Sequence, residues 1–240
     1  MRSGNPALNA RTFTDVSRGA DVRPMTLDGV VNRSSLLLIL VVAGALATWH
    51  LLPNPVAALP FASIGGLVMA VVTIFAKRTA FVTAPIYAIL EGVSLGALSA
   101  LTEPSFPGIA AQAVGLTTSI FLALLLTYRS GLVQPTENFK LGIFAATLGL
   151  GIFYLAGFVG SFFGWQLPLV HDTGLLGIGF SLFVVVLASL NLVLDFDFIE
   201  QGVHSRAPRF MEWYAAFGLV LTLVWLYVEV VNLLLKLRRD

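Results

Sequence analysis

Four acidic side chains lie inside long apolar stretches of this 240-residue chain, at Glu91, Asp195, Asp197 and Glu229. An aspartate at the centre of a membrane helix costs about 2.5 to 3.5 kcal/mol on insertion scales, so such a group faces a bundle interior, a partner or water. Acids in such places often mark an ion or proton path, and the plainer alternative is a structural polar contact between helices. These four residues are the first candidates for chemistry.

Glu229 lies on a polar or small stripe of the last apolar stretch. The stripe recurs at steps of four and three residues, which places its members on one helix face. Its members are Gly218, Thr222, Trp225, Glu229, Asn232 and Lys236. The rest of the stretch is Leu, Val and Tyr, which is typical of a helix that packs within a bundle and lines a narrow path.

Asp195 and Asn191 lie one turn apart in the sixth apolar stretch, so they share a helix face. Asp197 points about 200° away from Asp195, so only one of the two aspartates easily faces a given cavity. We choose Asp195, because Asn191 can share its polar site, and keep Asp197 as the fallback. Asp197 is expected to face the headgroups or Arg206.

Asp195 and Glu229 could form a proton sensor. If they approach within a few ångströms in low dielectric, they cannot both ionise comfortably and they titrate as a unit. Deprotonated, they offer the hard oxygen ligands that calcium prefers, so they are also candidates for transient calcium binding. Which of Asp195 and Asp197 pairs with Glu229 stays open at this point.

Glu91 lies beside a pair of glycines in the third apolar stretch. Gly92 and Gly96 form a face of small residues that allows close helix packing. A structural role is the stronger interpretation of these glycines, while Glu91 is a candidate for facing the same interior as Asp195 and Glu229.

Other chemistry finds little support in the sequence. The three histidines fall at the ends of apolar stretches without zinc-hydrolase spacing, and neither a nucleophile elbow nor a phosphate loop occurs. The chain has no cysteine, and its net charge of +1 argues against a nucleic-acid partner. We therefore predict neither an enzyme nor a cofactor, and an intramembrane aspartyl protease is weighed only as a minor possibility.

The elements that must position these acids are membrane helices. Hydrophobic residues make up 57% of the chain and charged residues only 11%, too few to cover a soluble surface. Seven apolar stretches are each long enough to span a bilayer, at residues 34–52, 56–76, 80–101, 107–127, 139–163, 173–196 and 213–235. We predict an all-α, polytopic, seven-helix membrane domain over residues 34–240, preceded by a polar, disordered cytoplasmic tail over residues 1–33.

The lysines and arginines predict the orientation. Eleven of them fall in the tail and in alternate connections, while the intervening connections hold none, which places the amino terminus in the cytoplasm. Residues 206–218, with Pro208, Glu212 and the aromatic rings of Trp213 and Tyr214, indicate a short interfacial stretch at the start of the last helix. We expect that helix to cross fully rather than to re-enter.

Three segments resemble the bacterial branch of the Bax inhibitor 1 family, also called the transmembrane BAX inhibitor motif family. They are YAILEGVSLGALS at residues 87–99, LDFDFIE at residues 194–200 and LYVEVVNLL at residues 226–234. The resemblance implies a seven-helix bundle with the last helix central, and a pH-sensitive calcium leak governed by acids on the sixth and seventh helices. By position these acids match Asp195 and Glu229, where the family usually has aspartate at the second site.

The resulting hypothesis is a cation leak channel of the bacterial inner membrane, for calcium or other cations, gated by Asp195 and Glu229. The alternative is a non-conducting regulator that binds other membrane proteins, such as a quality-control protease. Asn191, Asn232, Asp197 and Glu91 complete the predicted ion path.

Overall fold

The computed structural model describes residues 23–132, 135–164 and 168–238. These residues form seven long helices, which confirms the predicted all-α fold, and each is long and apolar enough to cross a membrane, alone or with a short adjoining 3-10 turn. The elements in order are α2 (Leu27–Leu51), η1 (Pro55–Ala58), α3 (Leu59–Phe75), η2 (Lys77–Thr79), α4 (Ala80–Thr102), α5 (Ile109–Arg129), α6 (Glu137–Ser161), α7 (Pro168–His171), α8 (Leu175–His204) and α9 (Met211–Leu237).

The first helix begins earlier than the sequence analysis predicted. Thr26 caps α2 by accepting a hydrogen bond from the Gly29 amide at 3.0 Å, and Asp28 lies in the first turn. Such a cap stabilises the free amides at a helix start. Residues 27–33 of the expected polar tail are therefore helical, and residues 1–22 lie outside the described residues.

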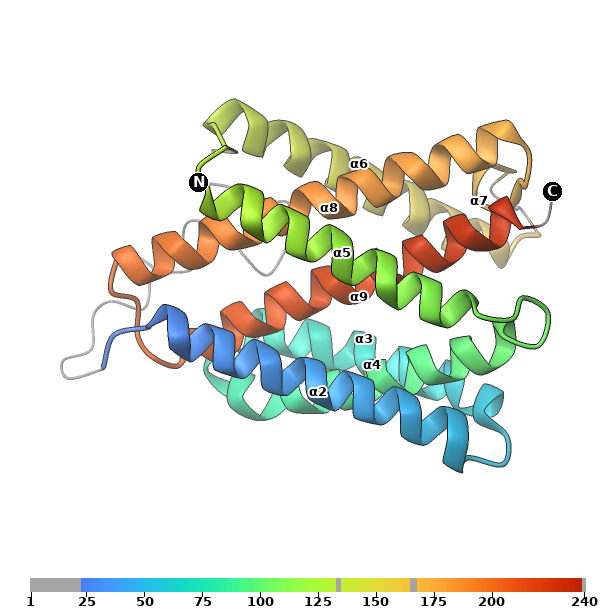
Figure 1. The fold of residues 1–240 in the computed structure, drawn as a ribbon, viewed down its shortest axis with the longest axis horizontal. Helices are drawn as coiled ribbons and strands as arrows, with labels where there is room; N and C mark the ends of the chain where they lie inside the picture. Colours follow the sequence, from blue (N-terminus) through green and yellow to red (C-terminus); the bar gives the residue numbers. More distant parts are fainter. Residues whose placement is uncertain (1–22, 133–134, 165–167, 239–240) are drawn as a thin grey trace.

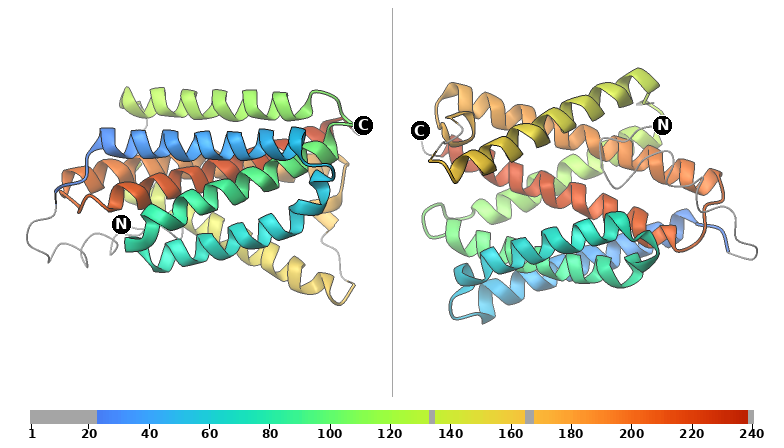
Figure 2. Two further views of the ribbon diagram at one scale, coloured as in Figure 1. Left: turned by 90° about the horizontal axis from the view of Figure 1, so that it is seen from below. Right: turned by 180° about the vertical axis from the view of Figure 1, so that it is seen from behind.

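The last helix, α9, is the centre of the bundle. It packs against α8, α2, α5 and α4, and Figures 1 and 2 show it running between these helices along the whole bundle. In the apolar part of α9, 61% of the residues are buried, whereas the corresponding fraction for the peripheral helix α6 is 17%. At 27 residues, α9 is long enough for a full crossing.

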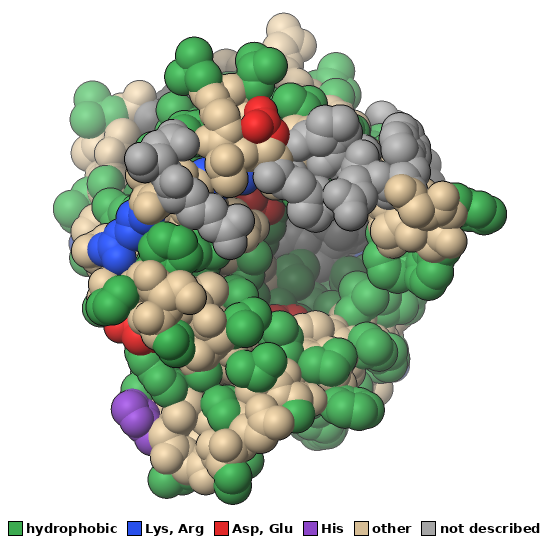
Figure 3. Space-filling model, turned by 90° about the vertical axis from the view of Figure 1, so that its right-hand side faces the viewer, with side chains coloured by type: hydrophobic (Ala, Val, Ile, Leu, Met, Phe, Trp, Pro, Cys, Tyr) green, Lys and Arg blue, Asp and Glu red, His purple; other side chains and the backbone are tan. Residues whose placement is uncertain are grey.

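The outer surface is largely apolar, as contact with lipid requires. Phe75, Phe163 and Leu175 are among the most exposed side chains, at 84%, 85% and 87%. In the end-on view of Figure 3, hydrophobic side chains cover much of the periphery, and the centre of this end is hollowed.

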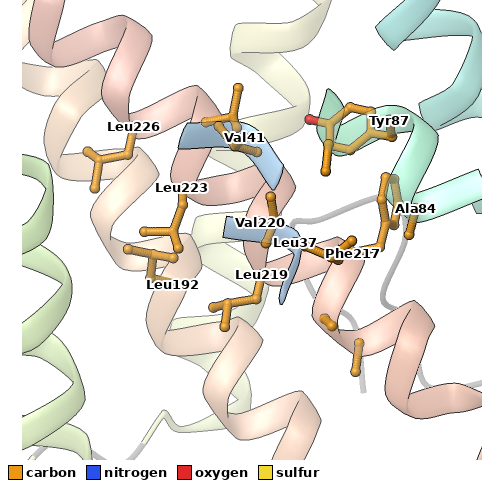
Figure 4. Close-up of a cluster of buried hydrophobic side chains, with 14 of the residues drawn as sticks. Leu37, Val41, Ala84, Tyr87, Leu192, Phe217, Leu219, Val220, Leu223 and Leu226 are labelled. Carbon is orange, nitrogen blue, oxygen red and sulfur yellow. The ribbon is translucent and has the colours of Figure 1, made fainter. Parts of the chain in front are cut away.

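The core forms where α9 meets its neighbours. Phe217 and Val220 of α9 are fully buried and lie in one cluster with Leu37 of α2, Tyr87 of α4 and Leu192 of α8 (Figure 4). The rings of Tyr87 and Phe217 meet edge to face with centroids 5.0 Å apart. Apolar packing of this kind holds α9 at the centre.

Small residues bring α2 and α4 together. A side chain added at Gly92 would strike the Val41 carbonyl oxygen, and one added at Gly96 would strike the Ala45 carbonyl oxygen. Gly44 lies against the Gly92 backbone from the other side. The predicted close packing at Gly92 and Gly96 is confirmed, and its partner is α2.

Replacing Gly96 by valine is expected to lower the free energy of unfolding by about 2 kcal/mol, because the two backbones must separate. Thermal unfolding of the purified protein in detergent measures the change. Gly149→Ala is the matched control, because a Cβ there meets open space and alanine favours the helix. A Gly96→Val protein as stable as this control would contradict the packing.

Candidate functional site

Glu229 lies two turns from the carboxyl-terminal end of α9 and is 6% exposed. Its Oε1 accepts hydrogen bonds from the Tyr154 hydroxyl of α6 at 3.2 Å and from Trp225 Nε1 at 3.3 Å. Together with the Asn232 side chain, these donors stabilise the carboxylate in an apolar span, and Tyr154 comes from a different helix. Glu229 therefore faces the space between α9 and α6.

Asn191 and Asp195 occupy the neighbouring part of α8 and are 1% and 0% exposed. Asn191 Nδ2 donates to Thr147 Oγ1 of α6 at 2.9 Å and to the Leu187 carbonyl at 2.9 Å. Its Oδ1 has no hydrogen-bond partner among the described residues. Asp195, one turn later on α8, lies about 40° around the helix from Asn191.

These side chains form a polar seam between α6, α8 and α9. We define the polar seam as Glu229, Tyr154, Asn191, Thr147 and Asp195. Each of the three helices contributes at least one member, and the surrounding side chains are apolar. Hydroxyl groups of α6 connect the seam to the other two helices, because Thr147 bonds Asn191 of α8 and Tyr154 bonds Glu229 of α9.

Within the seam, Asp195 and Glu229 lie in different layers. α8 ends at His204 and α9 begins at Met211, joined by a short turn, so depth along both helices can be counted from that face. Asp195 lies nine residues from His204, about 14 Å, and Glu229 lies eighteen residues from Met211, about 27 Å. The difference in depth is about 14 Å.

The contacts of α6 give the same result. Lys140 pairs with Asp197 near one end of α6, and Tyr154 bonds Glu229 fourteen residues farther along, about 21 Å away. Asp195 is therefore level with residues 218–222 of α9 rather than with Glu229. The structure does not bring the two acids together as a pair.

Asp197 lies apart from the seam, in an ion pair. Its Oδ2 is 2.7 Å from Lys140 Nζ of α6 and accepts a hydrogen bond from Gln201 Nε2 at 2.6 Å. We expected the headgroups or Arg206 as its surroundings, and that expectation is corrected. The reason is that Lys140, which lies in the first turn of α6, reaches across to α8 with its long side chain.

Lys140→Met is expected to lower the free energy of unfolding by about 1 to 3 kcal/mol, because Asp197 then keeps only Gln201 as a partner. The ammonium is largely buried and the carboxylate is 19% exposed. Thermal unfolding measures the loss. Glu137→Gln removes the other carboxylate near Lys140, which is 67% exposed, and should change stability little. Equal effects of the two substitutions would argue against the interhelical pair.

Glu91 and Asn232 are not placed in the polar seam. The Glu91 carboxylate lies against Gly66 of α3, where a Cβ would approach its Oε1 to 2.6 Å, and the residue is half-buried. Asn232 is exposed, but its side chain hydrogen-bonds Glu229, which precedes it by less than one turn. Among the described residues, no group of three or more His, Cys, Asp or Glu is placed to hold a metal ion.

The sequence analysis missed a buried charge cluster where α2 and α9 begin. Glu212 is 1% exposed, accepts from the Thr26 amide at 2.9 Å and the Thr26 hydroxyl at 3.0 Å, and forms an ion pair with Arg33. We placed Glu212 in an interfacial stretch and Arg33 in the tail. The available signal was Thr26 followed by Asp28, a helix start that would have put Arg33 inside α2.

The segment before α2 is joined to the turn before α9. The Met25 amide donates to the Ala207 carbonyl at 2.7 Å and the Arg209 amide to the Arg23 carbonyl at 2.9 Å, around an isolated bridge between Pro24 and Pro208. Met25 is 2% exposed. Together with the Glu212 cluster, these bonds attach the start of α2 to the start of the central helix.

Comparison with known proteins agrees with this architecture. Residues 5–239 match the protein family described as Bax inhibitor 1 like. No curated protein and no solved structure matches the chain. With seven apolar helices and a family match over nearly its whole length, the chain is a multi-pass membrane protein that belongs to the Bax inhibitor 1 like family.

Proposed function

We propose that the protein is a pH-sensitive cation leak channel, with calcium as the expected ion and the amino terminus in the cytoplasm of a bacterial inner membrane. The proposed path follows the polar seam. The observation that carries the proposal is the burial of two carboxylic acids, Asp195 and Glu229, inside apolar spans of neighbouring helices. Acids at such a cost are retained where an ion or proton must pass.

The acids act at successive levels in this proposal. Each carboxylate attracts a cation when ionised and loses that attraction when protonated, which makes the leak sensitive to pH. The groups that face Glu229 are Tyr154 of α6, and Trp225, Asn232 and Lys236 of α9. Asn191 lies between the two levels and offers an uncharged amide, so a cation passes from one acid to the next without meeting a fixed positive charge in between.

Calcium flux into vesicles that contain the purified protein tests the proposal. The wild type is expected to leak above empty vesicles, with a rate that changes with pH, and Asp195→Asn to lower the rate about tenfold. That loss corresponds to about 1.4 kcal/mol, well within what one nearby charge supplies at an effective dielectric constant of about 20. Asp28→Asn is the control, because Asp28 is exposed at the start of α2.

Flux no greater than that of empty vesicles at any pH would contradict the channel. It would favour the alternative, a non-conducting regulator that binds other membrane proteins through its helices.

A further inference from the structure

Lys236, near the carboxyl-terminal end of α9, is a buried base that the channel proposal leaves unexplained. It is only 8% exposed, and its Nζ donates to the Gly177 carbonyl at 3.0 Å and to the Leu169 carbonyl at 3.2 Å. These carbonyls belong to the first turn of α8 and to α7. An ammonium removed from water must find such acceptors, because its desolvation is costly.

Carboxylates complete the surroundings of this ammonium. Glu229, two turns earlier on α9, and Asp172, between α7 and α8, both interact electrostatically with Lys236. The group is thus held by two main-chain carbonyl oxygens and attracted by two acids. Oxygen donors of this kind are the ligands that hard metal cations prefer, so the ammonium stands where an inorganic cation could be bound.

The backbone keeps the carbonyl oxygens in place. The loop before α8 lies so close to the helix that a Cβ at Gly177 would strike the Asp172 carbonyl. Asp172 Oδ1 also accepts from the Gly174 amide at 2.9 Å, which secures the turn into α8. The two acceptors of Lys236 are therefore part of a tight connection rather than of an open loop.

We infer that the Lys236 ammonium occupies a cation-binding site. The site lies beyond Glu229, toward the carboxyl-terminal end of α9, and the ammonium closes the polar seam at this end. Figure 3 faces this end and shows the hollow, with acidic side chains at its margin. Without the ammonium, the same oxygen atoms bind a small inorganic cation. The closing role rests on the proposed function, while the binding site does not.

Thermal unfolding in detergent, with and without calcium chloride, tests the binding site. Lys236→Met removes the ammonium and keeps most of the side-chain volume. At a calcium concentration about ten times the dissociation constant, its unfolding temperature is expected to rise by about 3 to 6 °C beyond that of the wild type. Choline chloride of equal ionic strength is the blank, and sodium chloride shows whether a monovalent cation suffices.

Arg238→Met is the matched control. It removes one positive charge two residues away, from an exposed side chain that donates to the Pro107 carbonyl. Lys236→Arg keeps the charge and is expected to show no added stabilisation by calcium. If Lys236→Met does not fold, Lys236→Gln is measured instead, because its amide can still donate to a carbonyl. If calcium stabilises Lys236→Met no more than it stabilises Arg238→Met, the proposed binding site is wrong.

Vesicle flux tests the closing role. The Lys236→Met leak is expected to be roughly tenfold above the wild type, because a like charge within a few ångströms opposes an entering cation. Calcium stabilisation of the variant with no leak from any protein would support the site and contradict the channel. If the wild type leaks, but Lys236→Met shows neither stabilisation by calcium nor a faster flux, the inference is wrong. The channel proposal would then still hold.

Discussion

Replacing Arg33 by methionine is expected to lower the free energy of unfolding by about 3 kcal/mol, because it leaves the Glu212 carboxylate buried without its ion-pair partner. The Glu212 side chain is 2% exposed and that of Arg33 is 18% exposed, so water replaces little of the lost interaction. Thr26 still donates to the carboxylate, which keeps the expected loss at the lower end for a broken buried pair. Thermal unfolding should shift downward by about 6 to 12 °C.

Two further variants separate this effect from a general loss of charge. Arg209→Met removes an arginine whose Nε is 3.8 Å from Glu212 but whose side chain is 53% exposed, and it should cost at most about 1 kcal/mol. Adding Glu212→Gln to Arg33→Met should restore part of the stability, since no charge then stays buried. If the Arg33→Met and Arg209→Met proteins unfold at the same temperature, the buried ion pair contributes little to stability.

Glu229→Gln is expected to slow the calcium leak about tenfold, as Asp195→Asn does, because each removes a charge that attracts the cation. The double substitution distinguishes two acids in series from one shared proton. Sites more than about 10 Å apart behave independently, so the two factors should multiply to within about threefold. A double variant no slower than either single variant would contradict separate layers and restore the pair.

Much of the fold could be predicted from the sequence, because apolar length alone decides which segments span a bilayer. The last span, predicted at residues 213–235 and found as Met211–Leu237, and the close packing at the glycines of α4 follow directly from residue types and spacing. The start of α2 was harder to predict, because residues 27–33 include charged side chains that resemble the polar tail when Glu212, the partner of Arg33, is not considered. The charge of Arg33 has its ion-pair partner in Glu212, 179 positions later.

The sequence predicted which residues of α8 and α9 are buried, but not how deep each one lies along the axis of the bundle. Helix periodicity puts Asn191 beside Asp195, and Glu229 on the inner face of α9, which the buried positions of all three agree with. Periodicity does not determine how far one helix slides along another. The short turn between α8 and α9 sets that offset and places Asp195 about two and a half helix turns nearer to it than Glu229.

The same limit applies to the partners of charged side chains. Lys140 was counted only as a marker of orientation, yet it reaches Asp197 on another helix. Lys236 was counted as one member of a stripe, yet its acceptors are carbonyl groups of α7 and α8. Long side chains select partners across helices, and a helical wheel of one segment does not contain that information.

Cysteine modification at Thr147 tests most directly whether the polar seam conducts. The chain has no natural cysteine, so Thr147→Cys provides a single thiol beside Asn191. A cationic methanethiosulfonate reagent should modify it and reduce the calcium leak about tenfold, since it places a fixed positive charge in the path. Leu148→Cys is the control, because Leu148 is 53% exposed on the outer surface of α6. Its calcium leak should be unchanged after the same treatment. A Thr147→Cys protein that is modified and leaks unchanged would contradict the path.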